Sequence, residues 1–283
     1  MPELPEVETV CSGLNSALSG VIVSHLTLRR ADLRIPFPKN FAKRLEGVRI
    51  ERITRRAKYL LWHLDSGEVL IAHLGMSGCF IVDDGKEKPQ KHDHVIMTLK
   101  DGRRVIYRDP RRFGLMTLVD KKILNKHKLL AHLGPEPLEK EFTAEYLKSA
   151  LVKRTGSIKV ALMDQEVVVG VGNIYASEAL FMTGIHPLTK ARDALPMADK
   201  LVPAIRKVLS AAIASGGSSL KDFVHISGDS GYFQHHFSVY DREGELCQKC
   251  KKAIKNIRIS GRSSFFCPKC QPEIVSKRVK CTA

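Results

Sequence analysis

The first residues of the chain, Met1-Pro2-Glu3-Leu4-Pro5-Glu6, carry groups that could bond covalently to an electrophilic carbon. Removal of Met1, which is common before a small residue, leaves Pro2 with a free secondary amine. An ordinary α-amino group has a pKa of about 8, against about 10.4 for lysine, so more of it is unprotonated at neutral pH. Such amines form Schiff bases, and the adjacent Glu3 could transfer protons. The alternative is a solvated chain end, and the rest of the chain must decide between the two.

Four cysteines form a second group with chemical potential. Cys247-x-x-Cys250 and Cys267-x-x-Cys270 are separated by sixteen residues, a spacing typical of a four-cysteine zinc site. Each C-x-x-C turn aims two thiolates at one point, and two turns complete a tetrahedron. Since four thiolates close the coordination sphere, we expect one structural Zn²⁺. The alternative, a redox dithiol, needs only one C-x-x-C.

The composition restricts the possible partners. Lys and Arg number 46 against 30 Asp and Glu, a formal charge of +16, which favours a polyanionic partner such as nucleic acid over an acidic membrane surface. No apolar stretch approaches the ~20 residues of a membrane-spanning helix, and the first residues do not read as a signal peptide. We therefore expect a cytoplasmic protein. An odd count of seven cysteines argues against a disulfide framework. The remaining three are expected to be two core residues, Cys11 and Cys79, and one exposed thiol, Cys281.

The elements that must position the chain start are a helix and a set of short strands. Apolar residues from Val7 to Leu18 recur with helical spacing, and Pro5 suits a first helical turn, so a helix is predicted over residues 5–19. Alternating apolar runs separated by turn signals then predict an antiparallel β-sandwich or flattened barrel. These runs are Val21–Leu28, Val48–Thr54, Tyr59–Leu64, Val69–Leu74, Phe80–Val82, Val95–Leu99, Arg104–Tyr107 and Leu115–Val119.

The second half of the chain reads differently. Helical patterns dominate from about Lys121 to Phe223, and the clearest amphipathic helix covers Ala198–Ser215. A polar, glycine-rich stretch over residues 227–231 predicts a loop. Lys255–Ser260 and Arg262–Phe266 read as the two strands of a hairpin between the cysteine pairs.

Together these motifs resemble the bacterial formamidopyrimidine-DNA glycosylases, which repair oxidised purines. The resemblance runs from end to end and is carried by Met1–Thr9, Arg55–Leu60, His73–Gly78, Lys91–His94, Asp109–Gly114, Gly170–Glu178 and the four-cysteine finger. The related endonuclease VIII group shares the Pro-Glu start but usually differs at the third residue after the initiator and lacks the Arg-Arg-Phe run.

The resemblance implies an α+β fold of two lobes. The expected parts are an N-terminal helix plus antiparallel β-sandwich, and a C-terminal helical domain with a helix–two-turn–helix element and a β-hairpin zinc finger. The expected boundaries are 1–120 for the catalytic helix and sandwich, 121–135 for a hinge, 136–235 for the helical domain, 236–271 for the finger and 272–283 for a basic tail.

The resemblance also assigns catalytic roles. Pro2 attacks the sugar carbon that bears the damaged base, the base leaves, and the resulting iminium promotes β,δ-elimination of both phosphates. Glu3 is the expected proton shuttle, and Glu6 is expected to hold water or orient the site. Lys58 is expected to bind phosphate and to assist catalysis as a cation.

Base flipping and DNA binding involve further residues by resemblance. Flipping costs a few kcal/mol of unstacking, and the void is expected to be filled by Met76, Arg111 and Phe113. Arg111 presents planar donors to the orphaned base, which fits a partner cytosine. The expected phosphate contacts are Lys58, His73, Asn173 and Arg262, with contacts also assigned to His92 and Lys159. His92 and His94 form an H-x-H pair without an evident third metal ligand, so a structural or phosphate-contacting role is expected.

Some positions depart from the family pattern. Val160 follows Lys159 where proline is common, Asp241 replaces a usual glycine, and His236 stands where an acidic residue is common. The segment Ser218–Tyr232 corresponds to the family's loop over the oxidised base. A basic tail extends thirteen residues past Cys270, and it would add affinity for DNA that salt weakens.

The sequence thus predicts a monomeric bacterial enzyme, nucleoid-associated in the cytoplasm, that acts on duplex DNA containing an oxidised purine opposite cytosine. Two alternatives stay open at this level. One is an endonuclease VIII-like glycosylase for oxidised pyrimidines, and the other is a non-catalytic zinc-finger protein that only binds DNA.

Overall fold

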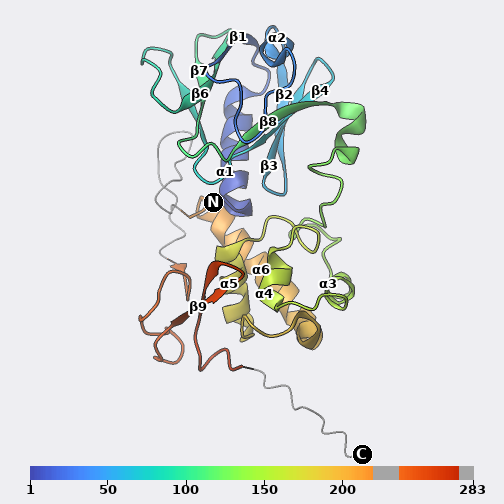
Figure 1. Ribbon diagram of the computed structural model, residues 1–283, viewed down its shortest axis with the longest axis vertical. Coiled ribbons are helices and arrows are strands. Elements are labelled where there is room, and N and C mark those ends of the chain that lie inside the picture. Colours follow the sequence, from blue (N-terminus) through green and yellow to red (C-terminus); the bar gives the residue numbers. More distant parts are fainter. Residues whose placement is uncertain (219–235, 274–283) are drawn as a thin grey trace, which may run out of the picture. The chain divides into compact units, whose positions relative to one another are not determined.

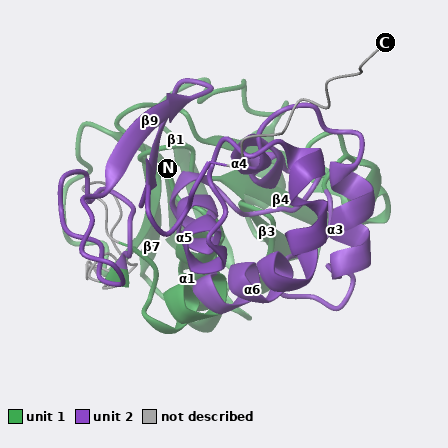
Figure 2. Ribbon diagram, turned by 90° about the horizontal axis from the view of Figure 1, so that it is seen from below, with its two compact units in different colours: residues 1–133, 209–236 green, residues 134–208, 237–283 purple. Residues whose placement is uncertain are grey.

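A computed structural model describes residues 1–218 and 236–273 of the chain. These residues form two compact units, and each is described by itself (Figure 2). Unit 1 contains residues 1–133 and 209–236, and unit 2 contains residues 134–208 and 237–283. The expected loop over residues 227–231, most of the segment 218–232, and the tail with Cys281 lie outside the described residues.

Unit 1 begins with the predicted helix, α1 (Leu4–Leu18), which runs alongside the strands of this unit (Figure 1). Proline lies in its first turn, where the missing N–H costs no hydrogen bond. One side of α1 is fully buried, including Val7, Val10, Leu14 and Leu18. The helix therefore holds the start of the chain against a packed core.

Two antiparallel four-stranded sheets make up the rest of unit 1, as the alternating runs predict. One has the order β1-β6-β7-β5 and the other β2-β3-β4-β8. The strands are β1 (Val23–Leu28), β2 (Ile50–Arg56), β3 (Tyr59–Leu64), β4 (Glu68–His73), β5 (Cys79–Asp83), β6 (Asp93–Leu99), β7 (Arg104–Arg108) and β8 (Leu115–Asp120).

A single apolar core joins α1 to both sheets and includes Trp62, Phe80 and Tyr107. A second cluster covers the other face of β3 and β4, where Leu61 and Ile71 pack against Leu130. Because both faces of β3 are covered, that strand is apolar along nearly its whole length rather than alternating. Two short helical pieces, α2 (Phe41–Leu45) and the 3₁₀ helix η1 (Lys121–Lys126), complete the unit.

Unit 2 is helical, with a terminal hairpin. Its helices are α3 (Ala144–Leu151), α4 (Ile158–Met163), α5 (Asn173–Thr183) and the 3₁₀ helix η2 (Ala191–Met197), and α6 (Ala198–Ala214) contributes residues to both units. Ser157 caps α4 by accepting the N–H of Val160. The hairpin consists of β9 (Lys255–Ile259) and β10 (Arg262–Phe266), paired antiparallel as expected.

Candidate functional site

The buried start of α1 is organised by one carboxylate. Pro2, Glu3 and Glu6 are all buried, the last two being 3 % and 2 % exposed. Glu6 Oε2 accepts the Glu3 N–H at 2.8 Å, and Glu6 Oε1 accepts both the N–H and the hydroxyl of Ser218, at 2.8 and 2.9 Å. Both oxygens of Glu6 are therefore occupied, and they tie the chain start to Ser218, shortly after the end of α6.

Side-chain bonds to β2 set the direction of α1. Asn15 accepts the Ile53 N–H at 2.8 Å, and nearer the start of the helix Glu8 accepts from Arg55 Nε at 2.5 Å. Moving towards the N-terminus of α1 thus means moving along β2 towards its turn into β3. That turn carries Lys58, which is 7 % exposed. The predicted catalytic residues Pro2, Glu3, Glu6 and Lys58 accordingly lie on elements that converge at one end of unit 1.

His73, at the end of β4, is a neutral hydrogen-bond donor. Its Nδ1 accepts the Gly75 N–H at 2.9 Å, so the ring proton must lie on Nε2. Burial, followed by the charges of Lys58 and Arg34, lowers the pKa of His73 from 6.5 to about 4. The charges of both Lys58 and Arg34 therefore act on this imidazole. Arg34 was not identified from the sequence, because no local motif connects it to residues 58 and 73.

The expected void-filling residues lie on two loops of the same unit. Met76 is half-buried, whereas Arg111 and Phe113 are exposed. The Arg111 guanidinium carbon lies 5.0 Å from the centre of the Phe113 ring, a cation–π contact that orients both side chains. Phe113 is 45 % exposed, so its ring is accessible for contact with a partner.

The histidines of the H-x-H pair differ in their surroundings. His94 is buried and its Nε2 donates to the Asp109 carbonyl oxygen at 2.8 Å, whereas His92 is half-buried. Among the described residues, neither belongs to a group of three or more possible metal ligands. The structure thus gives His94 a structural bond and leaves His92 nearer the surface.

In unit 2, the start of β10 is held by two of the predicted DNA-binding residues. Lys159 is 1 % exposed, and its Nζ donates to the Ser263 carbonyl oxygen at 3.1 Å and to Ser264 Oγ at 2.7 Å. Asn173 Nδ2 donates to the same Ser263 carbonyl at 2.9 Å. Both residues therefore fix the backbone immediately after Arg262, whose own side chain is exposed.

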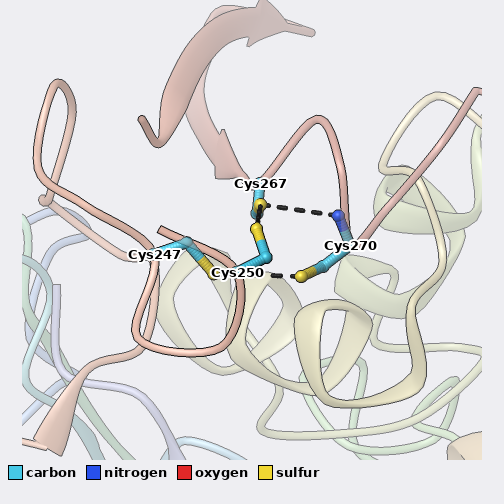
Figure 3. A group of neighbouring side chains, drawn as sticks. All are labelled: Cys247, Cys250, Cys267 and Cys270. Carbon is cyan, nitrogen blue, oxygen red and sulfur yellow. Dashed lines mark hydrogen bonds between the residues drawn. The ribbon is translucent and has the colours of Figure 1, made fainter. Parts of the chain in front are cut away.

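The four cysteines converge as their spacing predicts (Figure 3). Their sulfur atoms all lie within 4.8 Å of one another, and the Cys250–Cys267 pair is 3.4 Å apart. A tetrahedron with Zn–S bonds of about 2.3 Å has edges of roughly 3.8 Å, so one zinc ion fits this group. All four positions are filled by thiolates, and the ion is structural.

Glu178, on α5, is a further anchor that the sequence did not single out. It is 5 % exposed and accepts the backbone N–H groups of Ser238, Val239 and Tyr240, each at 2.9 Å. Burial raises the pKa of this carboxyl, and the three N–H groups partly offset the shift. The bonds connect α5 to the segment that leads into the cysteine turns.

Comparison with known proteins gives consistent matches along the chain. Residues 1–116 match the formamidopyrimidine-DNA glycosylase N-terminal domain, residues 133–224 its H2TH domain, and residues 244–272 the zinc finger found in FPG and IleRS. The formamidopyrimidine-DNA glycosylase of Ruegeria pomeroyi is 50 % identical over 282 residues, which cover 96 % of this chain and all of the relative. The chain belongs to the formamidopyrimidine-DNA glycosylase family.

Solved structures of the family agree with this fold. A point mutant of the Lactococcus lactis FPG, solved with Fapy-dG-containing DNA, has 32 % identity and a TM-score of 0.90 over 96 % of this chain and all of that one. MutM (FPG) from Thermus thermophilus has 37 % identity and a TM-score of 0.86, over 96 % of this chain and 99 % of that one.

The predicted fold class, family and zinc finger are therefore confirmed. As a formamidopyrimidine-DNA glycosylase, the chain is a bifunctional DNA glycosylase and AP lyase that removes oxidised purines. No helix in residues 1–218 or 236–273 is long and apolar enough to cross a membrane.

Proposed function

We propose that Pro2, freed of Met1, is the nucleophile that excises 8-oxoguanine and formamidopyrimidines from duplex DNA. Its nitrogen lone pair attacks C1′ of the flipped nucleotide, and the bond from C1′ to the base breaks. Opening of the sugar ring yields an iminium between Pro2 and the sugar. Proline has no backbone N–H within the chain, so the Pro2 nitrogen becomes a free secondary amine only when Met1 is removed. The burial of Pro2 at the fixed start of α1 supports this role.

The iminium then drives strand cleavage. Its positive charge acidifies the C2′ proton, whose removal expels the 3′ phosphate; a second elimination expels the 5′ phosphate and leaves a one-nucleotide gap. Glu3 moves the protons between leaving base, ring oxygen and C2′. Glu6 orients this end of the chain, which its bonds to Glu3 and Ser218 support. Lys58 offers a buried positive charge for the departing phosphate.

Binding requires that the damaged nucleotide leave the duplex. Met76, Arg111 and Phe113 fill the space, and Arg111 donates hydrogen bonds to the orphaned base. Cytosine presents acceptors at its pairing edge, so the preferred lesion lies opposite cytosine. The exposure of Arg111 and Phe113 in mutual contact supports this assignment.

Phosphate contacts fix the register of the DNA. His73 donates through Nε2–H, and His92 and Arg262 contribute further contacts. Asn173 lies at the first position of α5, where backbone N–H groups favour an anion. The ammonium group of Lys159 is buried and bonded to Ser263 and Ser264. In place of the expected phosphate contact, we assign Lys159 the role of positioning Arg262. The enzyme acts as a monomer in the bacterial cytoplasm, associated with the nucleoid.

Borohydride trapping on duplex DNA with 8-oxoguanine opposite cytosine tests the nucleophile. The adduct should map to residue 2 by mass spectrometry, and Pro2→Gly should weaken trapping. Glu3→Gln should abolish base release while DNA binding persists. An active enzyme that retains Met1, or an adduct on a lysine, contradicts the proposal.

Oxidised pyrimidines are a second candidate substrate. The Lactococcus lactis Fpg, 33 % identical with a TM-score of 0.89, was solved with DNA that contains an oxidised pyrimidine. Excision of thymine glycol, measured beside 8-oxoguanine under single-turnover conditions, gives the ranking. Faster removal of thymine glycol would favour this alternative.

A further inference from the structure

Two loops of unit 1 carry the void-filling residues, and a single buried side chain connects them. Met76 lies on the loop of residues 74–78, which joins β4 to β5. Arg111 and Phe113 lie on the loop of residues 109–114, which joins β7 to β8. Asp109, at the start of the second loop, is 0 % exposed.

The carboxylate of Asp109 accepts hydrogen bonds from both loops. Oδ1 accepts the Ser77 hydroxyl at 2.7 Å and the Arg111 N–H at 3.2 Å. Oδ2 accepts the Gly114 N–H at 2.8 Å and the Tyr107 hydroxyl at 3.3 Å. The four donors thus include the neighbour of Met76, the backbone of Arg111 and the neighbour of Phe113. A carboxylate can satisfy four donors because it carries only lone pairs, whereas an amide of the same shape replaces one acceptor by a donor.

The backbone of Asp109 is also fixed. Its N–H donates to the His92 carbonyl at 3.1 Å, and its carbonyl accepts from His94 Nε2 at 2.8 Å and from the Arg112 N–H at 3.3 Å. Arg112 itself has a φ of 60°, in the left-handed region that a residue of this kind adopts only when its surroundings impose it. The main chain therefore cannot follow a displaced Asp109 side chain without breaking its bonds to His92 and His94.

Two glycines let the loops approach this hub. A Cβ on Gly114 would lie 1.6 Å from the Tyr107 hydroxyl oxygen, and a Cβ on Gly75 would lie 2.4 Å from the Phe113 carbonyl carbon. The backbones around Met76 and Phe113 are thus in direct contact, which leaves little room for them to move independently.

We infer that Asp109 is a positioning residue that fixes Met76, Arg111 and Phe113 as one rigid wedge, and that it thereby sets the selection of the base opposite the lesion. The inference rests on the proposed role of Arg111. Asp109 is buried, so it acts through the loops and touches no DNA. In Asp109→Asn, the amide N–H₂ faces one of the two pairs of donors. The hydrogen bonds to that pair, either Ser77 and Arg111 or Gly114 and Tyr107, are then lost.

The test compares Asp109→Asn with Arg111→Ala in the full-length, zinc-loaded enzyme. Single-turnover excision of 8-oxoguanine is measured opposite cytosine and opposite adenine, together with cleavage at a preformed abasic site. A good side-chain-to-base contact is worth about 10-fold or more in discrimination, so Asp109→Asn should lower the cytosine-to-adenine ratio about as far as Arg111→Ala does. Cleavage at the abasic site should change much less, because the base is already gone.

Asp83→Asn is the matched control. Asp83 is a carboxylate on β5, in the sheet that also contains β7, and it pairs with Arg104 rather than with either loop. It should leave the ratio unchanged. The single tryptophan, Trp62, is 1 % exposed in the unit 1 core, and its fluorescence verifies that each variant is folded.

The outcomes separate the inference from the proposed function. A ratio unchanged in Asp109→Asn but lost in Arg111→Ala overturns the inference alone, whereas a ratio unchanged in Arg111→Ala overturns the wedge role itself. Equal losses on all three substrates would mean general damage and would also overturn the inference. Should Asp109→Asn fail to fold, Ser77→Ala and Tyr107→Phe, which each remove one donor, must lower the ratio; an unchanged ratio in both refutes it.

Discussion

The wedge loops of unit 1 and the zinc hairpin of unit 2 each present an exposed arginine to which we assign a DNA contact, Arg111 and Arg262, but the two regions are held in different ways. Arg111 is fixed by a network of hydrogen bonds centred on Asp109, and Gly75 and Gly114 allow the two loops to pack closely. Arg262 stands at the start of a two-stranded hairpin, which is too small to be stable alone. Four cysteines and two side chains, Lys159 and Asn173, hold it instead. The wedge is thus built by the chain itself, whereas the hairpin depends on a metal.

Zinc removal should give the largest effect and separate the two regions. We expect chelation, or Cys250→Ser, to lower DNA affinity by about 100-fold or more, because a structural zinc contributes on the order of 10 kcal/mol to a small finger and its phosphate contacts are lost with it. The emission of Trp62 should stay that of a folded unit 1. Loss of both signals together would show that unit 1 also depends on the metal.

Lower pH should reduce the stability of unit 1, which contains His73. The pKa of His73 lies at about 4 in the folded chain against 6.5 for the free side chain. The unfolded state therefore takes up a proton first as the pH falls, and stability is lost between about pH 6.5 and 4, by up to roughly 3 kcal/mol. His73→Gln cannot titrate, so the advantage of the wild type over this variant, measured by urea unfolding with Trp62 fluorescence, should shrink across that window. A constant difference would contradict the neutral His73.

A smaller effect tests whether Lys159 stabilises the hairpin or contacts the DNA directly. Lys159→Met leaves the Ser263 carbonyl with one donor fewer and should destabilise the hairpin by about 1–3 kcal/mol. Zinc release to a chelator, in the absence of DNA, should become faster. Arg262→Ala is the control. It should lower DNA affinity and should reduce by about one the slope of log affinity against log salt concentration, without changing the rate of zinc release. An unchanged rate of zinc release in Lys159→Met would contradict the structural role and favour a direct contact between Lys159 and a DNA phosphate.

The smallest effect concerns backbone strain before the finger. Asp241 has a φ of 58°, in the left-handed region that favours glycine. Asp241→Gly should stabilise unit 2 by about 0.5 kcal/mol, because relief of the left-handed strain exceeds the added freedom of the unfolded chain. A rise of the thermal midpoint of unit 2, followed by circular dichroism, checks this. A lower midpoint would mean that the Asp241 side chain makes a compensating contact.

The parts that could be predicted from sequence are those with a repeating physical signal. Alternating runs bounded by turn residues predicted the eight strands of the sandwich and the hairpin, with ends within a few residues. Helix α2 escaped because its five residues are too few to show a period. The cysteine spacing predicted the metal site, since a C-x-x-C turn has one dominant geometry.

The remaining site features depend on long-range contacts that no local pattern reveals. In the sequence, nothing distinguishes Asp109 from a surface aspartate in a charged segment. Its burial and its hydrogen bonds arise only because residues 77 and 114 approach it in the fold. Lys159 was expected to contact a DNA phosphate, and no local pattern reveals its hydrogen bonds to Ser263 and Ser264, which lie more than a hundred residues further along the chain. The charge of Arg34, on the segment between β1 and α2, likewise acts on His73 only in the folded chain.

The bond between Glu6 and Ser218 has a consequence for biosynthesis. It joins positions 212 residues apart, so the start of α1 obtains this partner only after most of the chain has left the ribosome. Until then the N-terminus lacks part of the structure that buries it. The proposed removal of Met1 requires an aminopeptidase to reach the bond before Pro2, which is buried in the finished fold although Met1 itself is 53 % exposed. We therefore expect Met1 to be removed most readily from the nascent chain, before residue 218 has been translated.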